Sequence, residues 1–273
     1  MKLRILTALI GIPAAVYIIT AGGWLFGAFV FLLAQVAWYE FWAMLKLKDL
    51  HVGYALGFLS ISALLAFAWL GSAAGILAAA VLTLLAVLMK AVAAHAKFSV
   101  PDAAFTIMGI FYIGLPFAHF LLLRFTDQFQ YITTSLGPIS LGAMYIWLAF
   151  LGTWASDTCA YFVGVACGKH KLCPAISPKK TMEGAAGGLI GSILAVAGVG
   201  YACHFPLPPL LALGLLVGIF APFGDLVESV LKRFAGVKDS GKIFPGHGGV
   251  LDRFDAMLFS VPVVYYYVNA FFR

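Results

Sequence analysis

Long apolar runs alternate with short polar segments along the whole chain, and this pattern predicts a bundle of membrane-spanning helices. A helix needs about 20 apolar residues to cross the roughly 30 Å hydrocarbon core of a bilayer. Nine runs approach or exceed that length, with expected limits of 5–21, 24–45, 53–70, 73–93, 103–123, 141–167, 184–203, 207–227 and 254–272. The predicted fold class is therefore all-α, a polytopic integral membrane protein of about nine transmembrane helices.

The runs follow one another without a repeat or a domain linker, so we expect a single membrane domain over residues 1–273. Its N-terminal helices would occupy about 1–125 and its catalytic C-terminal half about 140–273. Only Gly71 and Ser72 separate the third run from the fourth, which predicts a tight helical hairpin or one long broken helix. Lys2 and Arg4 before the first run resemble a signal peptide, but no clear cleavage site follows, and the run is interpreted as a retained helix.

Positive charges fall mostly on one predicted side of the membrane. If the N-terminus is cytoplasmic and each run crosses once, all but two of the 17 Lys and Arg residues lie in cytoplasmic segments, as the positive-inside rule requires. The exceptions are Arg124 and Arg273. Two cytoplasmic segments, about 168–183 and 228–255, are long and polar. We therefore expect the active site at the cytoplasmic face.

Composition excludes several classes of protein. The 273 residues are 63% hydrophobic and 10% charged, whereas soluble domains are about 45–50% apolar and 25% charged. A water-soluble fold and a disordered chain are both excluded. The net charge of +6 comes from basic residues too sparse for nucleic acid, which is not an expected partner. The four cysteines lack the spacing of a zinc site, and we expect them to pack as small apolar residues.

Polar residues around position 225 would form one stripe if the eighth helix continues past its apolar run. Spacing of i, i+3, i+4 and i+7 places them on one helical face; they are Asp225, Glu228, Ser229 and Lys232. An ionised carboxylate next to lipid is costly unless it is paired or bound to metal. Asp225 is therefore a functional candidate, with a structural ion pair to a nearby Lys as the alternative.

The following loop, from 237 to 249, has the composition of a phosphate-binding site. Its glycines would let the backbone approach closely, and its lysines would neutralise phosphate oxygens. Asp252 follows this loop, on the same predicted membrane side as Asp225. Two such carboxylates suit Mg²⁺, which prefers oxygen ligands. For His247, a phosphate contact and a structural role in the loop both remain open.

Two further carboxylates lie inside apolar runs. Asp157 meets the same energetic objection as Asp225, so we expect it to face a polar cavity. Glu40 lies among aromatic residues of the second run. A cavity residue and an interfacial anchor are both consistent with its position.

The segment before the seventh run combines basic residues with signals for a helix start. Thr181 is expected to cap the helix, with Glu183 in its first turn. Lys179 and Lys180 either contact phosphate or mark the cytoplasmic side. The glycines that follow are spaced for close helix packing, which would permit a homodimer without requiring one; they are Gly184, Gly187, Gly188 and Gly191.

One long motif resembles a known family. The run SVLKRFAGVKDSGKIFPGHGGVLDRFD at 229–255 resembles the signature of phosphatidate cytidylyltransferases, also called CDP-diacylglycerol synthases. The similarity extends to SPKKT at 177–181, to ASDT at 155–158 and to AYF at 160–162. The chain departs from the family pattern at Cys159 and Val165, where members more usually carry Gly and a basic residue.

The resemblance implies that CTP and phosphatidic acid give CDP-diacylglycerol and pyrophosphate, with Mg²⁺, alone or with a second cation, as cofactor. Direct attack of the lipid phosphate needs no nucleophilic side chain, so catalysis would be positioning and charge neutralisation. It implies a multi-pass protein of the bacterial plasma membrane. The expected catalytic residues are Asp225, Asp252, Lys232, Arg233, Lys238, Asp239 and Arg253, with Asp225 and Asp252 as metal ligands. The expected substrate-binding residues are Ser177, Lys179, Lys180, Thr181, Glu183, His247, Gly248, Gly249, Asp157 and Asp255.

Two other classes of function compete with this interpretation. Intramembrane carboxylates could form the relay of a transporter, although the polar residues gather at one membrane face and the chain lacks repeated halves. A lipid-binding scaffold would explain the basic loops but not the carboxylates beside them.

Overall fold

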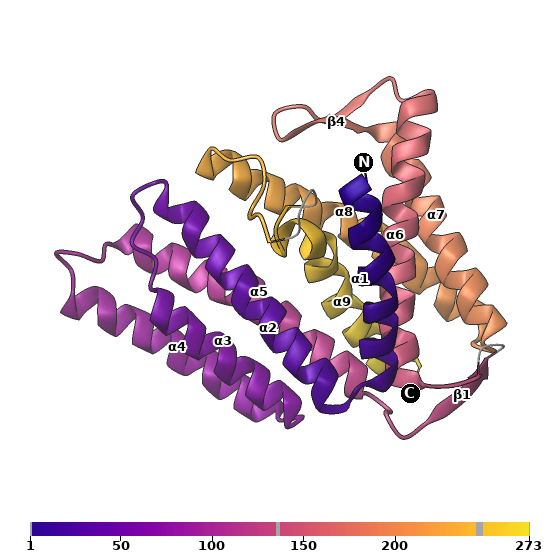
Figure 1. The fold of residues 1–273 in the computed structure, drawn as a ribbon, viewed down its shortest axis with the longest axis horizontal. Helices are drawn as coiled ribbons and strands as arrows, with labels where there is room; N and C mark the ends of the chain where they lie inside the picture. The colour runs from indigo at the N-terminus through magenta and orange to yellow at the C-terminus, as the bar shows by residue number, and fades with distance from the viewer. Residues whose placement is uncertain (1, 135–136, 244–247, 273) are drawn as a thin grey trace. The chain divides into compact units, whose positions relative to one another are not determined.

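The computed structural model describes residues 2–134, 137–243 and 248–272. This part of the chain contains nine α-helices and four short β-strands (Figure 1). It divides into two compact units. The first unit comprises Met1–Leu122 and Lys232–Arg253, and the second comprises Leu123–Leu231 and Phe254–Arg273.

Helices α1 to α4 and most of α5 belong to the first unit. Helix α2 contacts both α1 and α3, and α3 packs against α4. Gly71, with a φ of 65°, allows the tight turn between α3 and α4, and Ser72 caps α4 by accepting a hydrogen bond from the Gly75 amide. The helical hairpin is the alternative that the structure supports. The helices are α1 (Lys2–Ala21), α2 (Gly23–Lys46), α3 (Tyr54–Trp69), α4 (Ala73–Ala93) and α5 (Val100–Phe125).

The second unit contains the four strands, α6, α7 and most of α8 and α9. The strands form two separate antiparallel pairs, β1 with β2 and β3 with β4. The elements are β1 (Tyr131–Thr134), β2 (Gly137–Ser140), α6 (Leu141–Cys167), β3 (Lys171–Cys173), β4 (Ser177–Thr181), α7 (Met182–Ala202), α8 (Leu207–Ala235) and α9 (Leu251–Phe271).

The predicted helices agree closely with the observed ones, and the all-α integral membrane architecture is confirmed. Two boundaries differ in a way that matters for the site. Helix α8 continues to Ala235, and α9 begins at Leu251, so helical residues occupy both ends of the polar segment predicted at 228–255. Gly236, with a φ of 75°, ends α8 because glycine adopts the left-handed conformation that closes a helix. The strands were not predicted, since each has only three to five residues.

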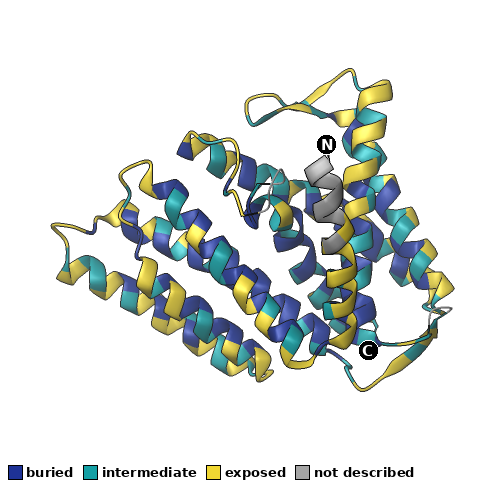
Figure 2. Ribbon diagram, viewed as in Figure 1, coloured by how far each residue is buried: buried dark blue, intermediate teal, exposed yellow. Residues whose placement is uncertain are grey.

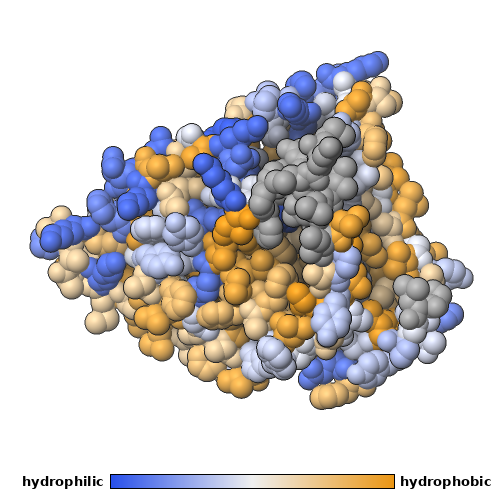
Figure 3. Space-filling model, viewed as in Figure 1, coloured by the Kyte–Doolittle hydropathy of each residue, from blue (hydrophilic) through white to orange (hydrophobic). Residues whose placement is uncertain are grey.

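Apolar side chains cover much of the outer surface of the helices, as expected for contact with lipid (Figure 3). Helix α4 shows this best, since much of its length is exposed (Figure 2) although it is the most apolar of the long helices. Among the described residues, five helices are long and apolar enough to span a membrane: α2, α4, α5, α7 and α8. The count of nine spans stays a prediction.

Helices α6 and α7 pack closely against each other along glycines of α7 (Figure 1). A Cβ atom at Gly188 would lie 2.8 Å from the Ser156 carbonyl oxygen, and one at Gly184 would lie 2.8 Å from that of Ala160. The packing role predicted for these glycines is therefore confirmed. The close approach matters for function, because both helices line the site described below.

Gly188→Ala is expected to destabilise the protein by about 1–3 kcal/mol, the usual cost of overpacking. The added methyl group would meet backbone, which cannot move aside as a side chain can. Gly198→Ala is the matched control on the same helix, because a Cβ there meets nothing within 4 Å. Thermal unfolding in detergent should show a lower Tm for the first variant and an unchanged or higher Tm for the second. Equal Tm values for the two variants would contradict the packing role.

Candidate active site

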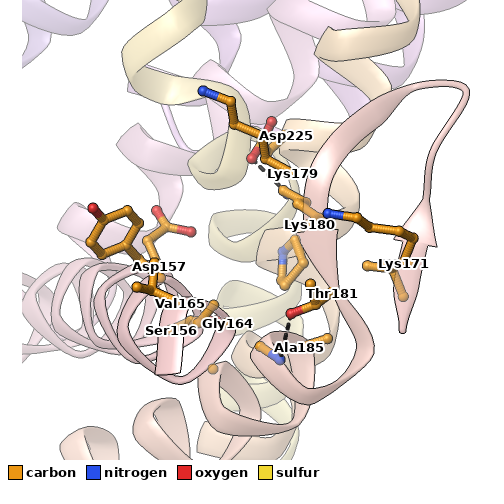
Figure 4. Close-up of a pocket in the computed structure, with 16 residues that line it drawn as sticks. Ser156, Asp157, Gly164, Val165, Lys171, Lys179, Lys180, Thr181, Ala185 and Asp225 are labelled. Atoms are coloured by element: carbon orange, nitrogen blue, oxygen red, sulfur yellow. Dashed lines mark hydrogen bonds and ion pairs between the residues drawn. The ribbon is translucent and has the colours of Figure 1, made fainter. Parts of the chain in front are cut away.

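A pocket of about 510 Å³ lies in the second unit, where α6, the β3–β4 pair, α7 and α8 meet (Figure 4). Helix α6 supplies Asp157 on one side, while β4 and α8 supply Lys180 and Asp225 across from it. Lys171 and Lys179 also line the pocket. The wall therefore carries three ammonium groups and two carboxylates, a composition that suits a phosphate group and a cation.

An ion pair joins two of these elements. Lys180 Nζ lies 2.6 Å from Asp225 Oδ2, and the two side chains are 26% and 32% exposed. The other carboxylate oxygen of Asp225 accepts a hydrogen bond from Ser229 Oγ at 3.3 Å. Asp225 is thus paired with a lysine, as the structural alternative expects, and it also lines a pocket. Its functional role stays a prediction.

The β3–β4 pair brings its lysines to the pocket through its attachment to α7. Thr181 ends β4 and caps α7, accepting a hydrogen bond from the Gly184 amide at 3.1 Å, as predicted. Lys171 pairs with Thr181 across the strands. Glu183, in the first turn of α7, lies 2.6 Å from Nδ1 of His170, the residue just before β3. These contacts fix both ends of the segment 171–181, which carries the lysines.

In the first unit, a second polar cluster surrounds Asp252 at the start of α9. Lys232 Nζ lies 2.7 Å from Asp252 Oδ1, in a pair whose side chains are 12% and 6% exposed. Asp252 Oδ2 accepts hydrogen bonds from the amides of Ser240 and Gly249, both at 2.8 Å, and from Ser240 Oγ at 2.9 Å. One buried carboxylate thus organises both ends of the loop 236–250.

The Asp252 carboxyl is held in its ionised form. Burial is the largest single influence on the pKa of this carboxyl, and it acts to raise the pKa. Three groups together outweigh burial and lower the pKa to about 2: the Gly249 amide, the Lys232 ammonium and the Ser240 amide. Asp252 precedes the last predicted span, so this charge belongs to the membrane surface. An ionised carboxylate is the form that a cation binds.

The two carboxylates predicted as metal ligands fit a hard cation by chemistry. Each has one oxygen that faces a lysine, Asp225 Oδ2 with Lys180 and Asp252 Oδ1 with Lys232. Exchange of an ammonium partner for a cation would keep each oxygen compensated. The described residues contain no cluster of three or more Asp, Glu, His or Cys side chains that could hold a metal. The prediction of a metal site therefore rests on these two carboxylates together with ligands from substrate.

The structure brings the predicted site residues into two groups, one in each unit. Asp157, Lys179, Lys180, Thr181 and Asp225 line the pocket of the second unit. Lys232, Gly249 and Asp252 form the cluster of the first unit, which Gly248 adjoins with a φ of 85°. His247 lies outside the described residues. The remaining predicted residues are not among the described residues that line the pocket: Ser177, Glu183, Asp255, Arg233, Lys238, Asp239 and Arg253.

Sequence reasoning missed three residues that belong to these groups. Lys171 and Ser156 line the pocket, and Ser240 donates to Asp252. Ser156 adjoins Asp157 in the ASDT motif, and Ser240 lies between Asp239 and Gly241, so their positions inside the motifs were a usable signal. Lys171 offered none beyond its charge.

The fold and the two clusters are typical of one class of protein, a membrane-integral enzyme with polar residues suited to phosphate chemistry. The sequence profile of the Cytidylyltransferase family matches residues 2–271. The chain therefore belongs to the cytidylyltransferase family and is a nucleotidyltransferase. The family favours an enzyme over the transporter and the lipid-binding scaffold considered above.

Individual relatives agree over nearly the whole chain. A phosphatidate cytidylyltransferase of Staphylococcus epidermidis is 38% identical over 272 residues, which cover 97% of both chains. One of Bacillus subtilis is 35% identical over 277 residues, covering 99% of this chain and 98% of its own. One of Staphylococcus aureus is 37% identical over 268 residues, covering 97% of both. The family resemblance predicted from the 229–255 motif is confirmed.

Proposed function

We propose that the protein transfers the cytidylyl group of CTP to phosphatidic acid, giving CDP-diacylglycerol and pyrophosphate. The relatives described above are named for this activity, and their similarity to this chain covers almost their full length. The observation that carries the proposal is the pocket in which Lys171, Lys179 and Lys180 meet Asp157 and Asp225. Its lining residues suit the binding of an anionic lipid headgroup beside an anionic nucleotide, because both substrates carry phosphate groups.

The reaction needs one bond formed and one broken. An oxygen of the lipid phosphate attacks the α-phosphorus of CTP, and the bond from that phosphorus to the bridging oxygen breaks to release pyrophosphate. Lys171, Lys179 and Lys180 would hold phosphate oxygens and reduce the repulsion between the two anions. Asp225 fixes Lys180 in the pocket by their 2.6 Å pair.

Asp225 and Asp252 would serve as ligands of Mg²⁺. When bound, Mg²⁺ supplies charge neutralisation at phosphate oxygens. Lys232, which pairs with Asp252, would contribute positive charge for phosphate oxygens. Asp157 would orient the neighbouring lysines.

The protein is proposed to reside in the bacterial plasma membrane, with nine spans and with its N-terminus and active site on the cytoplasmic side. The positive-inside pattern supports this orientation. Contacts inside each unit agree with it, because Lys180 and Asp225 join two segments that are both predicted to be cytoplasmic. CTP arrives from the cytoplasm, whereas the lipid substrate arrives within the membrane.

The proposal is tested with the purified protein in detergent micelles containing phosphatidic acid. Addition of CTP and Mg²⁺ should release pyrophosphate and form CDP-diacylglycerol in equal amounts. Omission of Mg²⁺, of CTP or of the lipid should abolish both products. A preparation that is folded by thermal unfolding yet forms neither product would overturn the proposed reaction.

Lys179→Ala is expected to raise the KM for CTP or for phosphatidic acid by about tenfold, the effect of losing roughly 1.4 kcal/mol of binding. The side chain is exposed and lines the pocket, so the fold should tolerate its removal. Lys97→Ala is the matched control, an exposed lysine in the segment between α4 and α5. Steady-state kinetics with each substrate varied provides the measurement. Unchanged KM values with a normal kcat would contradict a phosphate contact. Lys179 would then only mark the cytoplasmic side of the membrane.

A further inference from the structure

Glu40 is a buried carboxylate of α2 that binds the start of another helix. Its side chain is 2% exposed. Glu40 Oε1 accepts a hydrogen bond from the Val250 amide, and Oε2 accepts one from the Leu251 amide, both at 2.9 Å. Because α9 begins at Leu251, these are amides that no helical carbonyl satisfies. Glu40 therefore caps α9 from a helix about 210 residues away in the sequence.

Two described glycines of the segment between α8 and α9 leave room for this carboxylate. A Cβ atom at Gly241 or at Gly249 would overlap the carboxylate of Glu40. Only glycine therefore lets the loop backbone close over Glu40 at both points. The positive end of the α9 dipole further favours a negative charge at this place.

Ser240 connects Glu40 to Asp252. Its hydroxyl lies 3.3 Å from Glu40 Oε2 and 2.9 Å from Asp252 Oδ2. The Leu251 amide, bound to Glu40, directly precedes Asp252 in the chain. Glu40 thus holds Asp252 through two routes, the helix start and the Ser240 side chain. Neither interpretation left open by the sequence describes this role, since Glu40 is bound to protein rather than to a cavity or to the interface.

We propose that Glu40 is a positioning residue, which fixes the loop 236–250 and thereby sets Asp252 for the transfer reaction. Glu40 itself touches no substrate in this proposal, which rests on the proposed function for its catalytic part. The carboxylate form is essential, because the Val250 and Leu251 amides each donate to a different one of its two oxygens. A glutamine amide has only one acceptor oxygen and would turn an NH₂ group toward a backbone amide.

Glu40→Gln tests the proposal by two measurements on the full-length protein in detergent. Hydrogen exchange of peptides covering 236–252, without substrates, is expected to become at least about tenfold faster. The kcat for CTP-dependent transfer is expected to fall by about 10–100-fold, the usual effect of losing a group that orients a functional residue. The KM for CTP should change less than the kcat.

Gln35→Leu is the matched control, a polar side chain of the same helix whose amide donates to Ser62 Oγ on α3 at 3.1 Å. It should leave both measurements at wild-type values. Where Glu40→Gln does not yield folded protein, Ser240→Ala provides the test, with changes of the same sign and smaller size.

Unchanged exchange in Glu40→Gln would overturn the proposal. Faster exchange with wild-type kcat would overturn it as well, because Glu40 would then be a structural cap alone. A wild-type protein without CTP-dependent turnover would refute the proposed function separately, and exchange at 236–252 would then decide whether Glu40 holds the loop.

Discussion

Replacing Asp225 by Asn is expected to reduce CTP-dependent release of pyrophosphate by about 10³-fold or more while leaving the protein folded. The carboxylate is a proposed ligand of Mg²⁺, and it also holds Lys180 in the pocket at 2.6 Å. The substitution removes the charge on which both roles depend. Because the ion pair is partly exposed, its loss should cost less than about 1 kcal/mol of stability. Pyrophosphate release and thermal unfolding in detergent measure the two effects separately.

Asp49→Asn is a matched control for this prediction. Asp49 is exposed and has a φ of 55°, a conformation that Asn tolerates well, so the same change of charge and shape occurs outside the site. Its activity should equal that of the wild type. Substantial turnover by Asp225→Asn, above about a tenth of the wild-type rate, would refute the role of Asp225 as a metal ligand.

The helices were predictable because lipid imposes a simple requirement on the sequence. The run at 141–167 matches α6 residue for residue, and the run at 73–93 matches α4. Each limit coincides with a local signal, such as Ser140 and Ser72, whose side chains cap these helices. The end of α8 was harder to place, since Glu228 and Lys232 interrupt the apolar run without interrupting the helix. Gly236 marked the end instead.

The site was only partly predictable, because its contacts join residues that are distant in the sequence. The spacing of Asp225 along α8 indicated a polar face, but it could not identify Lys180 on β4 as the partner. In the same way, the aromatic surroundings of Glu40 concealed amides about 210 residues further along. Motif residues such as Lys179 were found because their residue type alone indicates phosphate chemistry. Lys171, which offered no signal beyond its charge, could be assigned to the pocket only from the structure.

Asp252→Asn is expected to abolish turnover to the same extent as Asp225→Asn, and to destabilise the protein as well. Asp252 pairs with Lys232 in surroundings where both side chains are at most 12% exposed. Removal of Asp252 breaks a buried ion pair, which costs about 3–5 kcal/mol. The asparagine oxygen could replace Oδ2, but its NH₂ group would then face Lys232. Chemical denaturation should show a lower free energy of unfolding for Asp252→Asn. The same measurement should show little change for Asp225→Asn.

A second substitution separates the two effects of Asp252. Lys232→Met in the Asp252→Asn background removes the ammonium that has lost its ion pair with Asp252, while keeping an apolar stem of similar length. The double variant should therefore recover at least about half of the lost stability, since both members of a buried ion pair are then replaced by neutral groups. Turnover should stay abolished, because the double variant still lacks the Asp252 carboxylate. Recovery of activity along with stability would mean that Asp252 serves only to hold the fold, and Asp252 would no longer be a candidate ligand of Mg²⁺.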